Sequence, residues 1–222
     1  MVNKKELKVS ALMTAPRYEC VWARNQIEIA LQKCGIPLYV SGGVFYGQCM
    51  QRMLNDVIEI GTDVAITIDF DSVFTPQDVQ RLLRVLTFND HIDAVCAFEA
   101  RRGKSVPLGT AGGVTEVATH GEPIQLTTAH FGLTAIDLHR LKEVPKPWFA
   151  SQPDSNGEWT DDKIDDDIWF WKQWQKAGRT IYMDTETRIG HLQEMITEFQ
   201  EVDGRFEVVH TYPKEWKDRN GC

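Results

Sequence analysis

The 222-residue chain lacks long apolar runs and an excess of positive charge. Its uncharged stretches are short, such as VAITI at 64–68, whereas about 20 apolar residues are needed to cross a bilayer. The N-terminal sequence MVNKKELKV is charged and lacks the apolar segment of a signal peptide. Acidic residues outnumber basic ones by 32 to 24, which argues against binding DNA mainly through its phosphates. We therefore expect a soluble, cytoplasmic protein without a membrane segment.

Motifs of several other protein classes are also missing. The five cysteines are odd in number and form no Cys-x-x-Cys pair, so neither a zinc site nor a disulfide framework is expected. The loop after the first expected strand, TAPRYE at 14–19, lacks the GxxxxGK[ST] and GxGxxG patterns. A P-loop enzyme and a dinucleotide-binding enzyme are therefore excluded.

The first 100 residues alternate between strand-like and helix-like segments. Apolar runs predict strands at 7–13, 37–41, 63–70 and 92–100. Helical spacing and end signals predict helices at 26–33, 46–60 and 77–88. This order favours an α/β fold with a mostly parallel central sheet flanked by helices.

The second half is more irregular. A strand is predicted over 127–136, and a short helix near 138–143. After a long loop, a helix over 166–177 and a strand over 180–183 follow. We expect one domain over 1–222, with a nucleotide-binding half at about 7–100, an acceptor half at about 101–192 and a C-terminal extension at 193–222.

The acid excess is concentrated in one segment. Between Asp154 and Asp167, seven acidic residues and one lysine account for six of the eight net negative charges. A solvated loop would explain most of them. The run Asp165-Asp166-Asp167 opens the predicted helix, where carboxylates are favoured by unpaired N–H groups. Three in a row exceed what a cap needs, so one of them is also a candidate general base.

Two further carboxylates lie at the end of the most strand-like segment. In the sequence IDFD, Asp69 and Asp71 project to the same side because strand side chains alternate. Two carboxylates so close repel unless a cation lies between them, and Mg²⁺ or Mn²⁺ prefers such oxygen ligands. The simpler alternative is a turn leading to the helix that begins near Thr75. His191 is a candidate further ligand, although a lone histidine is more often structural.

Other candidate residues follow from strand ends and from aromatic content. In open α/β sheets, ligands bind beyond the carboxyl ends of the strands, which directs attention to 14–19 and 41–43. There Tyr18 would stack on a base and Arg17 would meet a phosphate. Five of the seven tryptophans lie in 148–174, where they form either core or a sugar-binding cleft.

Taken in order, these motifs resemble those of a GT-A-fold glycosyltransferase, similar to the family-two type. The resemblance covers about residues 7–192 and rests on IDFD at 68–71, Lys146-Pro147-Trp148-Phe149, Asp166-Asp167-Ile168-Trp169-Phe170, Ala177-Gly178 and Gly190-His191. Two features depart from it. The family often has Glu-Asp where this chain has Asp166-Asp167. The common Arg-Asn ahead of the DxD strand is absent, and Gln48, Gln51 and Arg52 occupy that helix.

The resemblance implies a Rossmann-like GT-A domain that transfers a hexosyl or pentosyl group from a UDP- or GDP-sugar to an acceptor hydroxyl, with inversion. Asp71 and His191 would bind Mn²⁺ or Mg²⁺, assisted by Asp69. Asp167, or its neighbours Asp166 and Asp165, would be the general base. The donor site would be lined by Thr14, Ala15, Pro16, Arg17, Tyr18, Glu19, Ser41, Gly42, Gln51, Asp69 and Phe70. The acceptor would meet Trp148, Trp159 and Trp169.

Two alternatives remain beside this interpretation. A sugar-nucleotide nucleotidyltransferase has a similar nucleotide half, but it needs a glycine-rich loop with arginine and lysine, and TAPRYE is poor in glycine and has no lysine. A non-catalytic nucleotide- or sugar-binding module would not need a base. The acceptor is a glycan, a protein or a modified nucleic-acid base, the last kept open by the basic sequence at 101–104.

Overall fold

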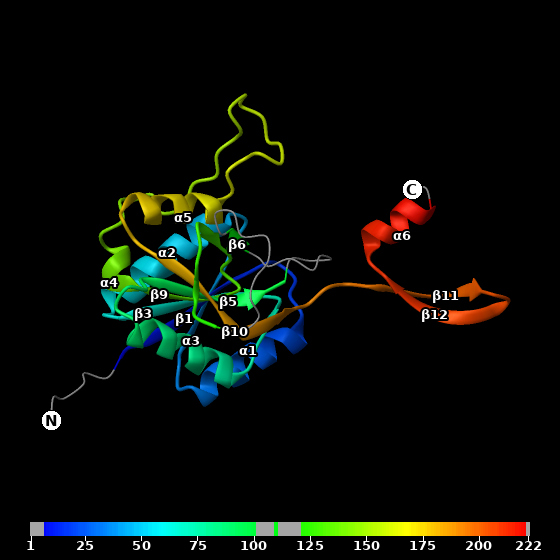
Figure 1. The fold of residues 1–222 in the computed structure, drawn as a ribbon, viewed down its shortest axis with the longest axis horizontal. Helices are drawn as coiled ribbons and strands as arrows, with labels where there is room; N and C mark the ends of the chain where they lie inside the picture. The colour runs from blue at the N-terminus through cyan, green and yellow to red at the C-terminus, as the bar shows by residue number, and fades with distance from the viewer. Residues whose placement is uncertain (1–6, 101–108, 111–120, 221–222) are drawn as a thin grey trace.

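The computed structural model describes residues 7–100, 109–110 and 121–220, and it has three layers, with helices on both faces of one sheet (Figure 1). The strands of this eight-stranded sheet are β1 (Val9–Ala15), β2 (Leu38–Gly42), β3 (Val64–Asp69), β4 (Ser72–Val73), β5 (Ala94–Glu99), β7 (Ile124–Gln125), β9 (Leu133–Asp137) and β10 (Ile181–His191). The helices are α1 (Val21–Lys33), α2 (Tyr46–Glu59), α3 (Pro76–Phe88), α4 (Leu138–Leu141), α5 (Asp166–Lys176) and α6 (Pro213–Asn220).

The strand order β2-β1-β3-β9-β5-β10-β4 confirms the predicted mostly parallel α/β architecture. The neighbours β2, β1 and β3 run parallel, as do β5 and β10. Strand β9 lies antiparallel between β3 and β5 in the middle of the sheet. A second short pair, β6 (Gly109–Thr110) and β8 (Thr128–Ala129), is antiparallel, so the strand predicted over 127–136 is in fact two strands.

Alternating strand side chains divide the core into two clusters. In β1, Ala11 and Met13 pack on the face covered by α1 and α3, while Leu12 packs on the face covered by α2, α4 and α5. The second face holds a cluster of packed aromatic side chains, in which Trp171 and Trp174 are fully buried. Helix α5 is thereby fixed over the sheet by apolar burial, and the acidic residues at its start are carried with it.

Local signals set most of the helix boundaries as predicted. Thr75 and Asp78 form a capping box at the start of α3, with Pro76 in the first turn. Gly178, in the left-handed region with φ 73°, follows α5. Helix α1 begins at residue 21, five residues before the predicted start. The pattern of apolar residues missed this first part because Val21 and Trp22 are apolar but exposed, which breaks the helical periodicity.

Strand β10 is much longer than the segment 180–183 that apolar content predicts. Its register shifts between Asp184 and Arg188, and the polar side chains of Asp184, Thr185 and Thr187 are buried at this bulge. The Arg81 guanidinium of α3 holds both carboxylate oxygens of Asp184, at 2.7 and 3.1 Å. The ion pair between Arg81 and Asp184 therefore stabilises this polar part of β10, and the strand continues from there to His191.

Two segments extend from the three-layer body (Figure 1). The loop before α5 is joined at its base by the bridge between Gln152 and Ile164. Within this loop, Asp154 accepts hydrogen bonds from the backbone N–H groups of Asn156 and Glu158 and from Thr160 Oγ1, so its carboxylate belongs to an ordered turn. Beyond His191, β11 (Ile196–Val202) and β12 (Arg205–Thr211) form a hairpin followed by α6.

Two sequence expectations bear on the limits of the described chain. None of the helices in the described ranges is both long and apolar enough to span a bilayer. The basic sequence at 101–104 lies outside the described residues.

The Asp184 anchor can be tested by stability. We expect Arg81→Met to lower the free energy of unfolding by about 3 kcal/mol, the low end for breaking a buried ion pair, since the Arg81 side chain is 34% exposed. Urea unfolding measures this, with Arg84→Met, an exposed arginine of the same helix, as the matched control.

The same pair predicts a dependence on pH. Burial raises the pKa of Asp184, but hydrogen bonds from Arg81 and Thr187 outweigh it and leave the pKa below its usual 3.8. The stabilisation is therefore present at pH values above the unfolded pKa of about 4, and it is lost as the pH falls through the lowered pKa of the folded state. The difference between the unchanged protein and Arg81→Met should shrink on acidification; a difference that grew would contradict the account.

Candidate functional site

The strand register aligns the predicted donor-site residues at one edge of the sheet. Thr14 of β1 lies opposite both Ser41 of β2 and Asp69 of β3, and Ala15 lies opposite Gly42. Since these three strands are parallel, their carboxyl ends meet there. The site predicted from three separate segments is thus one continuous edge.

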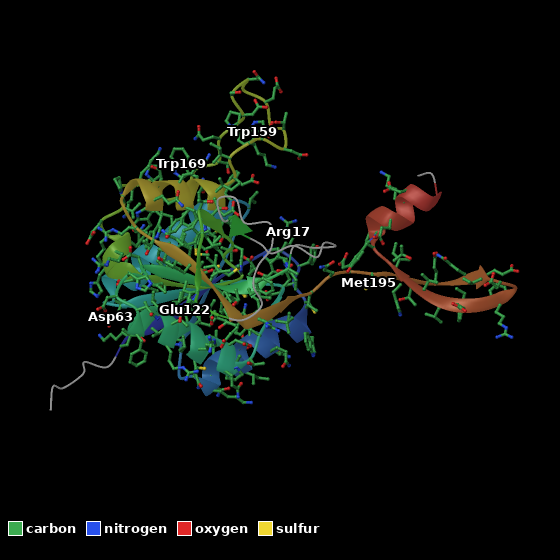
Figure 2. All side chains as sticks on the ribbon, in the orientation of Figure 1. Arg17, Asp63, Glu122, Trp159, Trp169 and Met195 are labelled. Carbon is green, nitrogen blue, oxygen red and sulfur yellow. The ribbon has the colours of Figure 1, made fainter. Side chains whose placement is uncertain are left out.

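The loop that follows β1 leaves this edge exposed. Arg17 and Pro16 are exposed, and Tyr18 is 85% exposed. In Figure 2, Arg17 lies on the side of the body from which the C-terminal hairpin extends. Glu19 lies 3.6 Å from Arg24 of α1 and ties the end of the loop to that helix.

Two other predicted donor-site residues have structural contacts. The Gln51 side-chain oxygen of α2 accepts a hydrogen bond from the Trp148 backbone N–H at 2.9 Å. This gives Gln51 a structural role between α2 and the segment before α5. Phe70 is half-buried and packs against the core on the α1 and α3 face.

A short strand pairing brings the candidate metal ligands together. Strand β4 runs antiparallel to the end of β10, so that Ser72 lies opposite His191 and Val73 opposite Gly190. In consequence His191 Nε2 lies 3.3 Å from Asp71 Oδ2. The Leu192 N–H also donates to the Asp71 carbonyl at 2.9 Å. Asp71 and His191, far apart in the sequence, therefore form one pair.

Asp69 belongs electrostatically to the same cluster. The pKa of Asp69 is raised to about 6, chiefly by burial. His130 and His191 act against this rise, and the carboxylates of Glu99 and Asp71 contribute to it. The five side chains therefore form a group in which acids outnumber histidines by three to two.

Glu99 and His130 are the members that sequence reasoning missed. Glu99 ends β5, and its side chain is 1% exposed. Its Oε1 lies 3.2 Å from His191 Nδ1 and its Oε2 lies 2.9 Å from His130 Nδ1. The sequence did contain a signal for Glu99, because it is the one acid at the end of the apolar run AVCAFE. That run forms β5, whose carboxyl end lies at the same edge of the sheet as the end of β3.

His130 lies in the turn before β9. Its Nε2 lies 2.9 Å from the Ala97 carbonyl oxygen. Its Nδ1 faces both Glu99 and the Gly132 N–H, at 2.9 and 3.0 Å. Burial lowers the pKa of His130, but its contacts with Cys96 and Glu99 outweigh this and raise it well above 6.5. The Gly132 N–H donates to Nδ1, and the Ala97 carbonyl oxygen accepts from Nε2.

Gly132 is required for this arrangement. A Cβ built on Gly132 would collide with Glu99 Oε2 and lie 2.9 Å from His130 Nδ1. The missing side chain thus leaves the space in which the carboxylate lies between the two imidazole rings.

The three successive aspartates at the start of α5 have different environments. Asp165 is exposed, and its carboxylate lies 3.6 Å from Lys163. Both oxygens of Asp166 are engaged: one accepts from the Gly47 N–H of α2 at 3.0 Å and the other from Ser151 Oγ at 2.9 Å. Asp166 therefore caps a neighbouring helix.

Asp167 is half-buried and accepts a hydrogen bond from the Ile168 N–H at 2.7 Å. Burial raises the pKa of Asp167, and the nearby charges of Asp165 and Asp166 raise it further, against the effect of that hydrogen bond. Its surroundings therefore make the Asp167 carboxylate more basic than an exposed aspartate.

Tyr46 links the two acidic groups. Its ring packs against Phe131 and Phe149, and its hydroxyl oxygen is buried without a hydrogen-bond partner in the described part of the chain. Burial raises the pKa of Tyr46, and so do Asp69, Asp167 and Asp166. The acids at the end of β3 and at the start of α5 therefore act on one common hydroxyl.

The tryptophans predicted to meet an acceptor differ in exposure. Trp148 is 3% exposed, and its Nε1 donates to the Val144 carbonyl oxygen, so its prediction as an acceptor contact is wrong. Its side chain is instead part of the buried aromatic core. Trp169 is half-buried on α5, and Trp159 is 64% exposed in the loop above it (Figure 2).

The cluster suits a hard divalent cation in its donor atoms. Two neighbouring ligands of an octahedral Mg²⁺ lie about 3 Å apart, close to the 3.3 Å between Asp71 Oδ2 and His191 Nε2. Carboxylate oxygen and imidazole nitrogen together also suit Mn²⁺. Within the ranges that the structure describes, no three His, Cys, Asp or Glu side chains are already arranged around one metal position.

Comparisons with known proteins give similarity in fold. No protein-family model matches the chain, and no curated protein matches its sequence. The solved structure of A197 from STIV has a TM-score of 0.59 at 14% identity and covers 92% of this chain and 94% of its own. GalNAc-T7 with UDP, GalNAc and Mn²⁺ has a TM-score of 0.52 at 10% identity, covering 91% of this chain and 45% of its own. The fold is therefore of the GT-A-like α/β type.

The unpartnered Tyr46 hydroxyl predicts an unusual mutational effect. Because a buried hydroxyl without a partner costs free energy, Tyr46→Phe should raise the free energy of unfolding of the ligand-free protein by about 1 kcal/mol. Chemical denaturation measures this, with Tyr39→Phe, an exposed tyrosine, as control. A loss of stability in Tyr46→Phe would show that the hydroxyl is satisfied in solution.

Proposed function

We propose that the chain is a metal-dependent glycosyltransferase that moves a hexosyl or pentosyl group from a UDP- or GDP-sugar to an acceptor hydroxyl, with inversion. One observation carries this proposal: the strand register sets Thr14 opposite Ser41 and Asp69 at the carboxyl ends of β1–β3, and it places His191 Nε2 3.3 Å from Asp71 Oδ2. The similarity in fold to GalNAc-T7, whose structure holds UDP, GalNAc and Mn²⁺, supports it.

The donor would lie along the carboxyl ends of β2, β1 and β3. The exposed Tyr18 ring is available to stack on the base, and the Arg17 guanidinium to pair with a phosphate. Thr14 and Ser41 lie opposite each other at this edge, where their hydroxyls would contact the nucleoside. The diphosphate would then point toward Asp69.

Asp71 and His191 would hold the metal, with Asp69 beside them. A bound Mn²⁺ or Mg²⁺ would offset the charge of the diphosphate and so improve it as a leaving group. Burial is the main cause of the raised pKa of Asp69, and the carboxylates of Glu99 and Asp71 add to it, so a cation bound there would favour the charged form of Asp69.

Asp167 would act as the general base. It would accept the proton of the acceptor hydroxyl as that oxygen attacks the anomeric carbon and the bond to the diphosphate breaks. Its raised pKa makes it a better proton acceptor than an exposed aspartate. Asp166 is engaged by Gly47 and Ser151, and Asp165 is solvated, so neither is as well suited.

The acceptor would approach over the start of α5. The loop over 151–165 extends above this helix and carries the exposed Trp159, which is available to stack on a sugar ring (Figure 2). Trp169 of the same helix is partly exposed. A glycan, a protein or a modified base would each present a hydroxyl there.

Nucleotide binding tests the donor assignment. We expect UDP or GDP to raise the melting temperature by several degrees with Mn²⁺, and by much less without it, because Asp71 and His191 would hold the metal and its charge would favour the diphosphate. A thermal-shift series with UDP, GDP and CDP, with and without Mn²⁺, measures this, and Asp71→Asn should lose the metal-dependent part. Equal shifts with and without metal would contradict the proposal.

The base assignment is tested by three matched variants. Asp167→Asn should lower the transfer rate at least 100-fold while leaving the nucleotide-dependent thermal shift unchanged, because only proton acceptance is lost. Asp165→Asn should stay within about twofold of the unchanged protein. Asp166→Asn should lose stability, since it caps α2. An active Asp167→Asn with an inactive Asp165→Asn would overturn the assignment.

A further inference from the structure

We propose that the hairpin of β11 and β12 is a dimerisation arm, one face of which binds the same face of a second copy of the chain. This surface lies outside the proposed active site, so the inference goes beyond the proposed function. Figure 1 shows the hairpin extending from the three-layer body. Because an isolated two-stranded hairpin has little stability of its own in water, we expect a further contact to hold it.

The strand register divides the side chains of the hairpin between two faces. Opposite residues of paired strands share a face, and successive residues alternate between faces. One face, which we call the open face, is exposed along its whole length. It consists of the three cross-strand pairs Thr197–His210, Phe199–Val208 and Glu201–Phe206.

The open face carries both phenylalanines of the hairpin. Phe199 is 72% exposed, Phe206 is 77% exposed and Val208 is 54% exposed. On the opposite face, by contrast, the aliphatic side chains of Ile196 and Val209 are half-buried. The largest apolar side chains of the hairpin are therefore the ones left in water, which is typical of a surface that binds another protein.

The charges of the hairpin favour a second copy as that protein. Three of the five charged residues in 196–211, Glu198, Arg205 and Glu207, lie on the opposite face and would stay in water. The open face keeps one acid, Glu201, near the turn, and one imidazole, His210, at the end joined to the body. A face with an acid at one end and an imidazole at the other is complementary to a reversed copy of itself.

A two-fold axis that crosses both strands at Phe199 and Val208 would stack two open faces in opposite directions. Phe199 would then pack against the partner's Phe199 at the axis. Glu201 would lie over the partner's Thr197–His210 pair. Since Thr197 Oγ1 already lies 3.0 Å from His210 Nδ1, the carboxylate would meet Nε2.

The same charges disfavour the other symmetric arrangement, in which the two hairpins point the same way. An axis along the strands would place Glu201 on the partner's Phe206, because these two residues are cross-strand partners. A carboxylate covered by an aromatic ring loses its water without gaining a hydrogen bond, which costs free energy. The geometry therefore assigns the reversed arrangement to the dimer.

The size of the contact predicts a weak dimer. Each strand has seven residues and is about 23 Å long. Two stacked faces of this length bury less than the roughly 1,200 Å² at which standard interfaces begin, and contacts below that size are typical of weak association. We expect a dissociation constant in the micromolar range.

Sedimentation velocity of the full chain over a concentration series is the first test. The mass should rise from that of one chain at low micromolar concentration toward that of two chains at several hundred micromolar. Phe199→Gln should raise the dissociation constant at least about 10-fold, since each dimer loses two rings at its centre. Val202→Gln removes an exposed apolar side chain from the opposite face of the same strand, and it should stay within about twofold.

A second pair of variants tests the charge complementarity. Glu201→Gln should raise the dissociation constant several-fold, because it removes the carboxylate that would meet the partner's His210. Glu207→Gln removes the same charge from an exposed residue of the opposite face and should leave the constant unchanged. Equal effects of the two variants would contradict the assigned face.

The two-fold axis itself can be tested by cross-linking. In a background with Cys20→Ser and Cys222→Ser, which removes the exposed Cys20 thiol and the C-terminal thiol, Phe199→Cys places one thiol beside the axis. Mild oxidation should join two chains through this introduced thiol. Val202→Cys, which points to the opposite face, should stay largely uncross-linked under the same conditions.

The outcomes decide the inference without reference to the transferase activity. A single-chain mass at every concentration would overturn it, whether the hairpin then folds back on its own body or binds a different protein. A dimer that Phe199→Gln leaves intact would place the contact elsewhere and overturn it equally. Because Phe199 is exposed, the variant should fold, and an unchanged melting temperature at low concentration confirms this.

Discussion

The pairing of β4 with the end of β10 is the constraint on which the site depends. Two residues of β4 lie antiparallel to Gly190 and His191, and this register alone places His191 against Asp71. The bulge in β10 lies between two stretches of its parallel pairing with β5, the second of which sets Ile189 opposite Glu99, and at the bulge the buried Asp184 is held by Arg81. The site is therefore set by backbone register and by one charged anchor.

The acidic groups of the chain fall into three physical classes. Asp154 and its neighbours form an ordered, exposed turn, which explains much of the net charge without a binding role. Asp166 stabilises the start of α2. Asp69, Asp71, Glu99 and Asp167 are the acids whose surroundings include burial, neighbouring carboxylates or histidines. Metal binding and catalysis are proposed within the last class alone. The number of acidic residues therefore says less about the site than the burial of the individual carboxylates does.

The sequence predicted the fold well where its elements are apolar and locally capped. Strands β1, β2, β3 and β5 and helices α2 and α3 follow from hydrophobic patterns and turn residues. It failed at β10, where buried threonines and Asp184 hide a strand in polar residues, and at Trp148, whose burial depends on the aromatic cluster. Glu99 and His130 were missed because their meeting with His191 depends on a sheet order that local patterns do not specify.

The central claim is that one divalent cation is held between Asp71 and His191 at the diphosphate end of the donor site. Anomalous diffraction at the manganese edge, from crystals grown with Mn²⁺ and UDP, tests it most directly. The account predicts one strong peak within ligand distance of Asp71 and His191, with the UDP phosphates beside it. UDP bound along β1–β3 with no peak there, or a peak only at the acidic loop over 154–162, would contradict it.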